Sequence, residues 1–145
     1  MLNIRLRRLL NMADVMAMLS QMRSASGDMD TIGLPDHVIL EFASLDDKLV
    51  QAVQEASEKQ SQYPSEHLMM NEKDLVTILQ EDYVNFYAPA TVNPYVAIAG
   101  RGPWIVTSHG AVLHDNGGYG MLGGGHGPSE IISVMSENHV MANVM

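Results

Sequence analysis

The 145-residue chain contains no cysteine, which excludes disulfide bonds, thiolate nucleophiles and cysteine-ligated zinc. Basic residues are also scarce: 8 Lys and Arg stand against 17 Asp and Glu, so the formal net charge is −9. Binding to duplex nucleic acid needs a basic face, which this balance argues against. No stretch approaches the roughly 18 to 20 uninterrupted apolar residues of a membrane span. We therefore expect neither nucleic-acid nor membrane partners and a cytoplasmic location.

Lysine is the least frequent charged residue, and the chain contains only Lys48, Lys59 and Lys73. All three lie in polar, helix-forming stretches beside acidic residues, so we expect solvated side chains. A lysine that forms a Schiff base needs an activating environment, such as a hydrophobic pocket or a second cation. None of the three fits that description, so imine chemistry cannot be completed within this chain.

Three segments before residue 87 carry helix signals. We expect a short helix over residues 4–22. Ser44 followed by Asp47 matches a capping box and predicts that a second helix starts there and runs to about residue 60. Asn71 with Asp74 repeats the pattern, and the short connection predicts that the second and third helices pack antiparallel. The apolar face predicted for the third helix comprises Leu75, Val76, Ile78, Leu79, Tyr83 and Phe86.

The composition changes from residue 87 onward. Prolines preclude a continuous helix, and 10 of the 12 glycines lie between residues 100 and 127. The runs 103–107 and 111–114 are rich in β-forming residues, and the three residues between them end in Gly110, which predicts a hairpin. Ser129 predicts the N-cap of a last helix over residues 130–140. The predicted inner face of that helix comprises Ile131, Ile132, Met135 and Val140.

Together these signals predict an α+β fold in two parts. Residues 1–86 form a mostly helical N-terminal extension. Residues 87–145 carry a small antiparallel β element followed by one helix.

Residues 87–145 contain the side chains and loops for two candidate binding sites, one for a metal ion and one for an anion. The metal donors His109, His114, Asp115, His126 and His139 show no known ligand spacing, so we predict no metal. Asp115 has a simpler use as the cap of the turn at residues 116–117. The loop 123–127 ahead of a capped helix suits an anion, although glycines that permit tight turns are the favoured interpretation.

Residues 110–128 resemble the N-terminal signature of the class III aminotransferases, which are pyridoxal-phosphate enzymes of fold type I. In that family a glycine precedes a short strand ending in Asp, and after a glycine-containing turn and a small loop a Gly-His pair and a proline open a helix. The residues that match in order are Gly110, Asp115, Gly125, His126 and Pro128. The resemblance extends over about residues 86–145.

The resemblance implies that the chain is the N-terminal fragment of an enzyme with an α/β parent fold. The full-length enzyme would bind pyridoxal 5′-phosphate, form a homodimer and move an amino group between an amino acid or ω-amine and a 2-oxo acid. Its cofactor-binding residues, including the Schiff-base lysine, would lie beyond Met145, so the fragment alone should be inactive.

The resemblance also implies which residues of the loop face the substrate. In related enzymes the residue seven before the Gly-His histidine faces the substrate, which here gives Tyr119 with its neighbour Gly120. The Tyr119 hydroxyl would bind a substrate carboxylate or amine while its ring lines the pocket. Two departures from the family pattern, at Gly127 and at His114, leave the subgroup and the substrate open.

Two alternatives stay open beside the enzyme. One is a non-enzymatic interaction or anion-binding module whose helical half docks a partner, and the other is a histidine-dependent metalloprotein. An arm that lies on a larger domain leaves apolar faces uncovered when it is alone. We expect the last helix and the run Trp104–Val106 to be those exposed faces.

Overall fold

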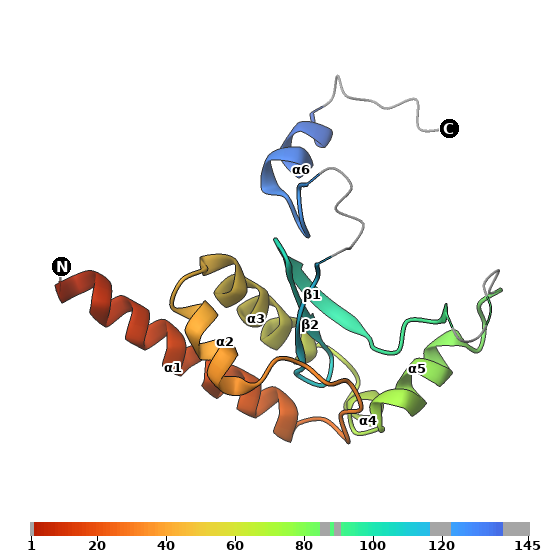
Figure 1. Cartoon of the computed structure of the whole chain (residues 1–145). Coiled ribbons are helices and arrows are strands. Elements are labelled where there is room, and N and C mark those ends of the chain that lie inside the picture. Colours follow the sequence, from red (N-terminus) through yellow and green to blue (C-terminus); the bar gives the residue numbers. More distant parts are fainter. Residues whose placement is uncertain (1, 85–87, 89–90, 117–122, 138–145) are drawn as a thin grey trace.

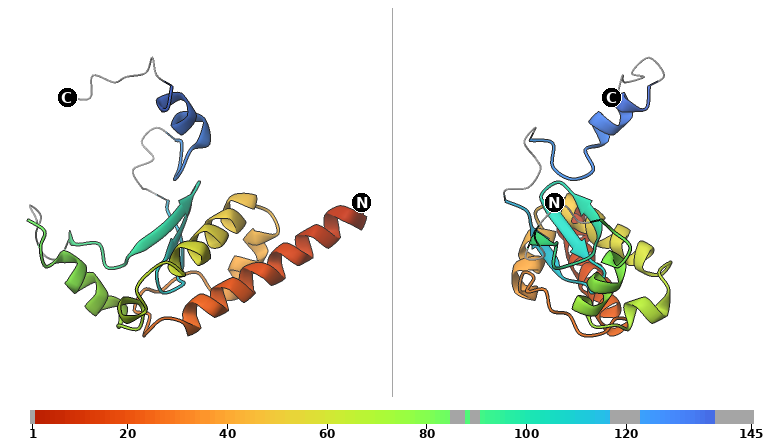
Figure 2. Two further views of the ribbon diagram at one scale, coloured as in Figure 1. Left: turned by 180° about the vertical axis from the view of Figure 1, so that it is seen from behind. Right: turned by 90° about the vertical axis from the view of Figure 1, so that its right-hand side faces the viewer.

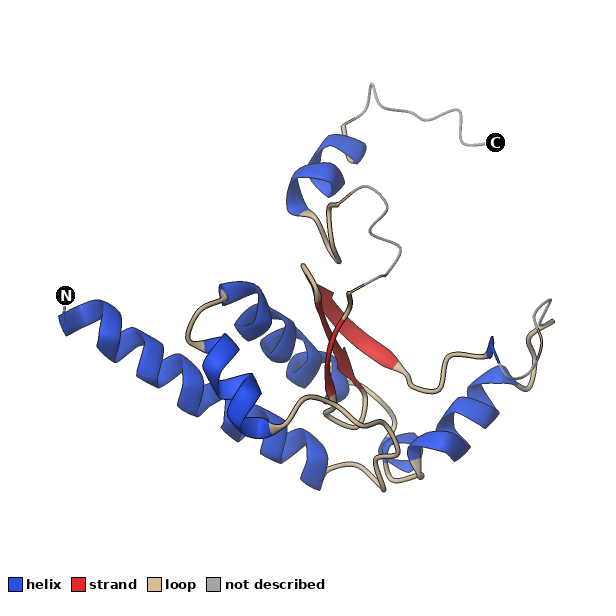
Figure 3. Cartoon of the chain, in the orientation of Figure 1, coloured by secondary structure: helices blue, strands red, loops and turns tan. Residues whose placement is uncertain are grey.

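The computed structural model describes residues 2–84, 88, 91–116 and 123–137, and within them the predicted α+β fold is confirmed (Figure 1). Six helices and one three-stranded antiparallel sheet make up the described part (Figure 3). The helices are α1 (Leu2–Ser24), α2 (Asp36–Ala43), α3 (Asp47–Gln60), α4 (Ser65–Leu68), α5 (Glu72–Gln80) and α6 (Ser129–Met135). The strands are β1 (Ala97–Arg101), β2 (Trp104–Thr107) and β3 (Val112–His114).

Helix α3 is the centre of the packing. It contacts α1 on one side and both β1 and β2 on the other, which the views in Figure 2 also show. The helical spacing of its apolar residues places Leu49, Val53 and Ala56 in the interior. Val15 and Leu19 of α1 meet this face, so helices and sheet share one hydrophobic core. The core contains residues from both sides of the boundary predicted at residue 86. The division of the chain into two parts therefore stays a prediction.

The start of α3 differs from the prediction. Its N-cap is Asp46, whose carboxylate accepts a hydrogen bond from the Lys48 N–H at 2.9 Å, so Ser44 was the wrong cap. Ser44 instead ends α2, and its hydroxyl donates to the Glu41 carbonyl oxygen. Helix α2 was not predicted; it begins directly after Pro35, which occupies its N-cap position.

Helix α5 has the predicted cap but not the predicted packing. The Asn71 side chain accepts from the Lys73 N–H, which confirms the cap. Of the predicted apolar face, however, only Leu75 is fully buried, while Ile78 and Tyr83 are exposed; Phe86 lies outside the described residues. Among the described helices α5 packs mainly with the short α4, and the predicted antiparallel packing on α3 is wrong, since α3 packs against α1, α2, β1 and β2 instead.

The predicted hairpin is confirmed as β2 and β3, with β1 added on the other side of β2 in the order β1-β2-β3. Gly110 has a φ of +78°, and its N–H donates to the Thr107 carbonyl oxygen to close the loop. The predicted exposure of Trp104–Val106 is wrong, because α3 covers β2 and all of its side chains are buried. The Trp104 indole N–H donates to the Asp46 carboxylate at 2.7 Å, so one aspartate both caps α3 and ties it to the sheet.

Candidate functional site at the glycine-rich loop

The glycine-rich loop pairs with the tight turn between β1 and β2. The Gly102 N–H donates to the His126 carbonyl oxygen at 2.8 Å, and the His126 N–H donates back to Gly102 at 2.7 Å. These two bonds join residues that are 24 positions apart in the sequence and fix the loop to the body of the protein. Helix α6 follows directly and stands clear of the other helices (Figures 1 and 2).

Two glycines permit this close approach. Gly125 has a φ of +67°, and a Cβ atom there would lie 2.8 Å from the Gly102 Cα and carbonyl oxygen. At Gly100 a Cβ atom would lie 3.0 Å from the Cβ of His126. The neighbours at Gly125 are backbone atoms, which have little freedom to move aside, whereas those at Gly100 belong to the His126 side chain. Within the loop, Gly125 therefore serves tight packing, in line with the favoured interpretation, while a Cβ atom at Gly123 would meet nothing within 4 Å.

The Asp115 and His126 side chains are brought together by this pairing. His126 Nε2 lies 2.9 Å from Asp115 Oδ2, and since a carboxylate only accepts, the imidazole donates through Nε2–H. The Asp115 N–H in turn donates to the Pro103 carbonyl oxygen at 2.7 Å. The predicted capping of the turn at 116–117 falls partly on residue 117, outside the described residues.

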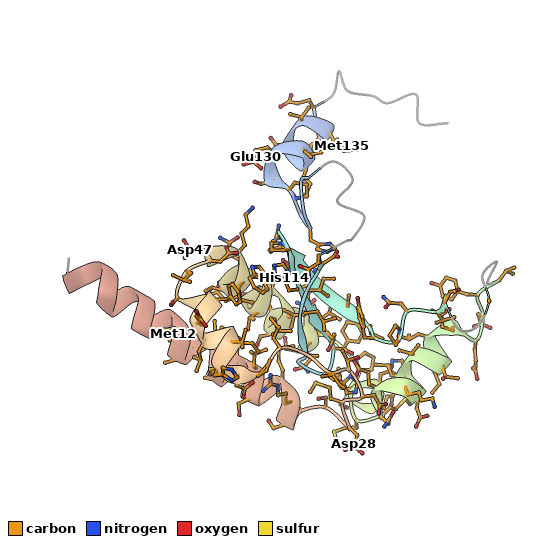
Figure 4. The ribbon with its side chains drawn as sticks, in the orientation of Figure 1. Met12, Asp28, Asp47, His114, Glu130 and Met135 are labelled. Atoms are coloured by element: carbon orange, nitrogen blue, oxygen red, sulfur yellow. The ribbon has the colours of Figure 1, made fainter. Side chains whose placement is uncertain are left out.

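The start of α6 differs from the prediction. Pro128, not Ser129, occupies the N-cap position, and its carbonyl oxygen accepts from the Ile132 N–H. Ser129 is the first residue of the helix, and its hydroxyl donates to the Glu130 carboxylate. The Glu130 carboxyl, labelled in Figure 4, has a lowered pKa, chiefly because its own backbone N–H and then the Ser129 hydroxyl bind the ionised form.

No residue of α6 is buried, so the predicted inner face is left largely exposed (Figure 4). The predicted exposure of the last helix is thereby confirmed for Ile131, Ile132 and Met135, while Val140 lies outside the described residues. The last helix was predicted to run to residue 140, whereas the structure describes this segment only up to residue 137. Within that range α6 ends at Met135.

A charged cluster that the sequence analysis missed lies beside the loop. The Glu55 carboxylate binds Lys59 Nζ at 2.7 Å and Arg101 Nε at 2.8 Å. The Lys59 hydrogen bond, and the charges of Lys59 and Arg101, hold the pKa of the Glu55 carboxyl below its ordinary value of 4.5 against a smaller opposing effect of burial. The i,i+4 spacing of Glu55 and Lys59 is a readable signal. Nothing in the sequence near Arg101 points to a partner 46 residues away.

Two hollows flank Arg101, His126 and Gly127. The larger is an open groove of about 410 Å³ along β1. The smaller, of about 140 Å³, lies between Lys48 and the start of α6. It is where the predicted anion would lie, but the Glu130 carboxylate already lines it and interacts with Lys48.

The described histidines of the alternative metal set, His109, His114 and His126, do not converge on one site. His109 is fully buried, with Nε2–H donating to the Met70 carbonyl oxygen and Nδ1 accepting from the Ser108 hydroxyl. His114 is exposed and contacts the Trp104 ring. Within the ranges that the structure describes, no group of three or more metal-binding side chains is found. The predicted substrate-facing residues Tyr119 and Gly120, and the candidate metal donor His139, lie outside those ranges.

The chain was compared with family models, curated proteins and solved structures. None of them matches it. Within the described part, the helices are too short or too polar to cross a membrane.

Proposed function

We propose that the chain is the N-terminal part of a class III, pyridoxal-phosphate-dependent aminotransferase. One observation supports this: four of the five residues of the resemblance, which lie on two separate segments, fold into one unit. Asp115 binds His126, Gly125 permits the contact with the β1–β2 turn, and Pro128 caps the helix that follows. Each residue type of the pattern thus has a physical reason in this chain.

In this proposal the unit covers the mouth of a substrate site. Tyr119 and Gly120, on the segment between Asp115 and Gly125, face an amino acid or ω-amine substrate, and a 2-oxo acid accepts the amino group. The exposed apolar face of α6 fits the same proposal, because an arm leaves such a face uncovered until the rest of the enzyme, or the second subunit of a homodimer, packs on it.

The described residues by themselves do not fit a pyridoxal-phosphate site. All three lysines are exposed, as expected, and Lys59 is engaged with Glu55. Lys48 is the lysine that lines the small hollow at the loop, and the carbons of its side chain lie over Gly102. The proposal therefore assigns the cofactor contacts to residues outside this chain, and no catalytic step is assigned to the described residues.

The test is expression of the reading frame together with the codons that follow residue 145. The longer product should carry bound pyridoxal phosphate, seen by its absorbance, and should transfer amino groups from a panel of amino acids and ω-amines to pyruvate or 2-oxoglutarate. The 145-residue chain should do neither. A stop codon directly after residue 145, or a longer product without the cofactor, refutes the proposal.

The role of Tyr119 has its own control. In the longer product Tyr119→Phe should lower kcat/KM about tenfold, the effect of removing one hydrogen bond to a charged substrate group. Tyr95→Phe, at a half-buried tyrosine outside the resembling loop, should leave kcat/KM unchanged. Equal effects of the two variants contradict the assignment.

The second candidate is a non-enzymatic interaction module. The observation that favours it is the groove along β1 beside the uncovered α6. A 145-residue chain that is a stable monomer, melts cooperatively and binds a partner at this surface would support the module over the arm of an enzyme.

A further inference from the structure

Among the eight asparagines of the chain, Asn116 alone is followed by glycine. Asparagine is one of the thermolabile residues of proteins, because the backbone nitrogen of the next residue can attack its side-chain amide. A glycine at that next position hinders the attack least and has the greatest conformational freedom to reach the amide carbon. Gly117 lies outside the described residues and enters only through its covalent bond to Asn116 and its lack of a side chain.

The structure adds a hydrogen-bond donor to this sequence feature. His114 Nδ1 lies 2.6 Å from Asn116 Oδ1, and since an amide oxygen only accepts, the imidazole donates through Nδ1–H. Both side chains are exposed, so water reaches them. His114, labelled in Figure 4, is the last residue of β3, and its ring packs edge-on against the buried Trp104. This ring contact holds the donor beside the Asn116 amide.

We propose that Asn116 is a site of spontaneous deamidation that His114 promotes. The Gly117 nitrogen attacks Cγ of Asn116, and negative charge develops on Oδ1, where the Nδ1–H of His114 stabilises it as an oxyanion-hole donor does. The Cγ–Nδ2 bond then breaks, and Nδ2 leaves as ammonia with the proton that the Gly117 nitrogen gives up. The product is a cyclic imide. This inference does not depend on the aminotransferase proposal.

The imide changes the entry into the glycine-rich loop. Water opens it at either of its two carbonyl carbons, which gives aspartate or isoaspartate at position 116. Both products add one negative charge directly after Asp115, the residue that binds His126. Isoaspartate also lengthens the main chain, because the chain then runs through the side-chain carbons. The reaction is therefore a slow, irreversible modification of the segment between β3 and the loop.

The experiment incubates the chain in mildly alkaline buffer made with ¹⁸O-labelled water and follows position 116 by peptide mass spectrometry. The product should carry one ¹⁸O atom, and part of it should be isoaspartate, which an isoaspartyl methyltransferase labels. Isoaspartate distinguishes the imide from direct hydrolysis of the side chain, which gives aspartate alone.

Asn71 is an internal control in the same digest. Its Oδ1 also accepts a hydrogen bond, from the Lys73 N–H at 2.8 Å. The residue that follows it is Glu72, however, whose N–H already donates to the Asp28 carbonyl oxygen at 2.9 Å. With its neighbouring nitrogen engaged and no glycine after it, Asn71 should stay intact while Asn116 converts.

Two variants of His114 form a matched pair. His114→Phe keeps a ring against Trp104 but removes the donor, and should slow the conversion of Asn116 about tenfold, the effect of losing one hydrogen bond to a developing charge. His114→Asn places an amide N–H close to the position of Nδ1 and should keep most of the rate. Because His114 is exposed, neither change disturbs the core.

Three results overturn the proposal. The first is conversion of Asn116 no faster than that of Asn71. The second is a product that contains aspartate without isoaspartate, because the imide would then not form. The third is equal rates in His114→Phe and the unchanged chain, which would show that the imidazole does not promote the reaction.

Discussion

Two glycines of the loop allow the cost of a side chain at positive φ to be measured separately from the cost of a clash with the β1–β2 turn. Gly123 and Gly125 have nearly the same φ, +69° and +67°, but a Cβ atom at Gly123 meets nothing within 4 Å. At Gly125 it would lie 2.8 Å from the backbone of Gly102. A side chain in this left-handed region costs about 1 kcal/mol at either position. Gly125→Ala also breaks the two bonds between Gly102 and His126, about 1 kcal/mol each, for a total of about 3 kcal/mol.

The loss is local, since α6 buries no residue and can detach without exposing the core. The assay is therefore hydrogen exchange at the Gly102 and His126 amides, which form the bridge. Gly125→Ala should accelerate their exchange about 150-fold and Gly123→Ala about fivefold, by the usual factor of ten for each 1.4 kcal/mol. The urea midpoint of the core should hardly change. Equal acceleration in the two variants would show that the close contact contributes nothing and would refute the reasoning.

Three further predictions concern the body of the protein. Gln60→Leu should lower the free energy of unfolding in urea by about 3 kcal/mol, because the Gln60 amide donates to two buried carbonyl oxygens, whereas Gln62→Leu on the exposed surface should change it little. Glu72→Ala should cost about 2 kcal/mol in the same assay, since the buried carboxylate accepts two backbone N–H bonds; a cost near zero would contradict this. Glu55→Gln should lower stability at neutral pH by about 0.5 kcal/mol. Folding lowers the pKa of the Glu55 carboxyl, so its contribution to the free energy of unfolding is present above pH 4.5 and is lost as the pH falls through the lowered pKa. A stability difference between Glu55→Gln and the unchanged chain that persists in acid would contradict this prediction.

The parts of the fold that depend on local signals were predictable. A helix was expected over most of α1, the spacing of apolar residues located α3, and a three-residue connection ending in glycine located the hairpin of β2 and β3. The cap at Asn71 was correct for the same reason, because its side chain bonds only two residues ahead. Each of these features is decided within one or two turns of chain.

Features that join distant segments were not predictable. The pair of Asp115 and His126 was named as a set of matching residues, but nothing in the sequence showed that their side chains meet. Arg101 and its partner Glu55 were missed entirely, since they come from different elements. The wrong choice of Ser44 as a cap has a different, local origin. The Ser-x-x-Asp pattern is present, yet the turn that ends α2 uses this residue, and α3 begins only after Asp46.

The sequence by itself determined that the protein lacks thiol chemistry and is acidic, and it determined where most of its helices and the hairpin lie. Those properties follow from composition and from interactions between near neighbours. Only the tertiary structure decided which apolar faces are covered. The periodic faces of α3, α5 and α6 look alike in the sequence, but only α3 is enclosed by α1 and the sheet, because burial depends on what packs against a face and not on the face itself.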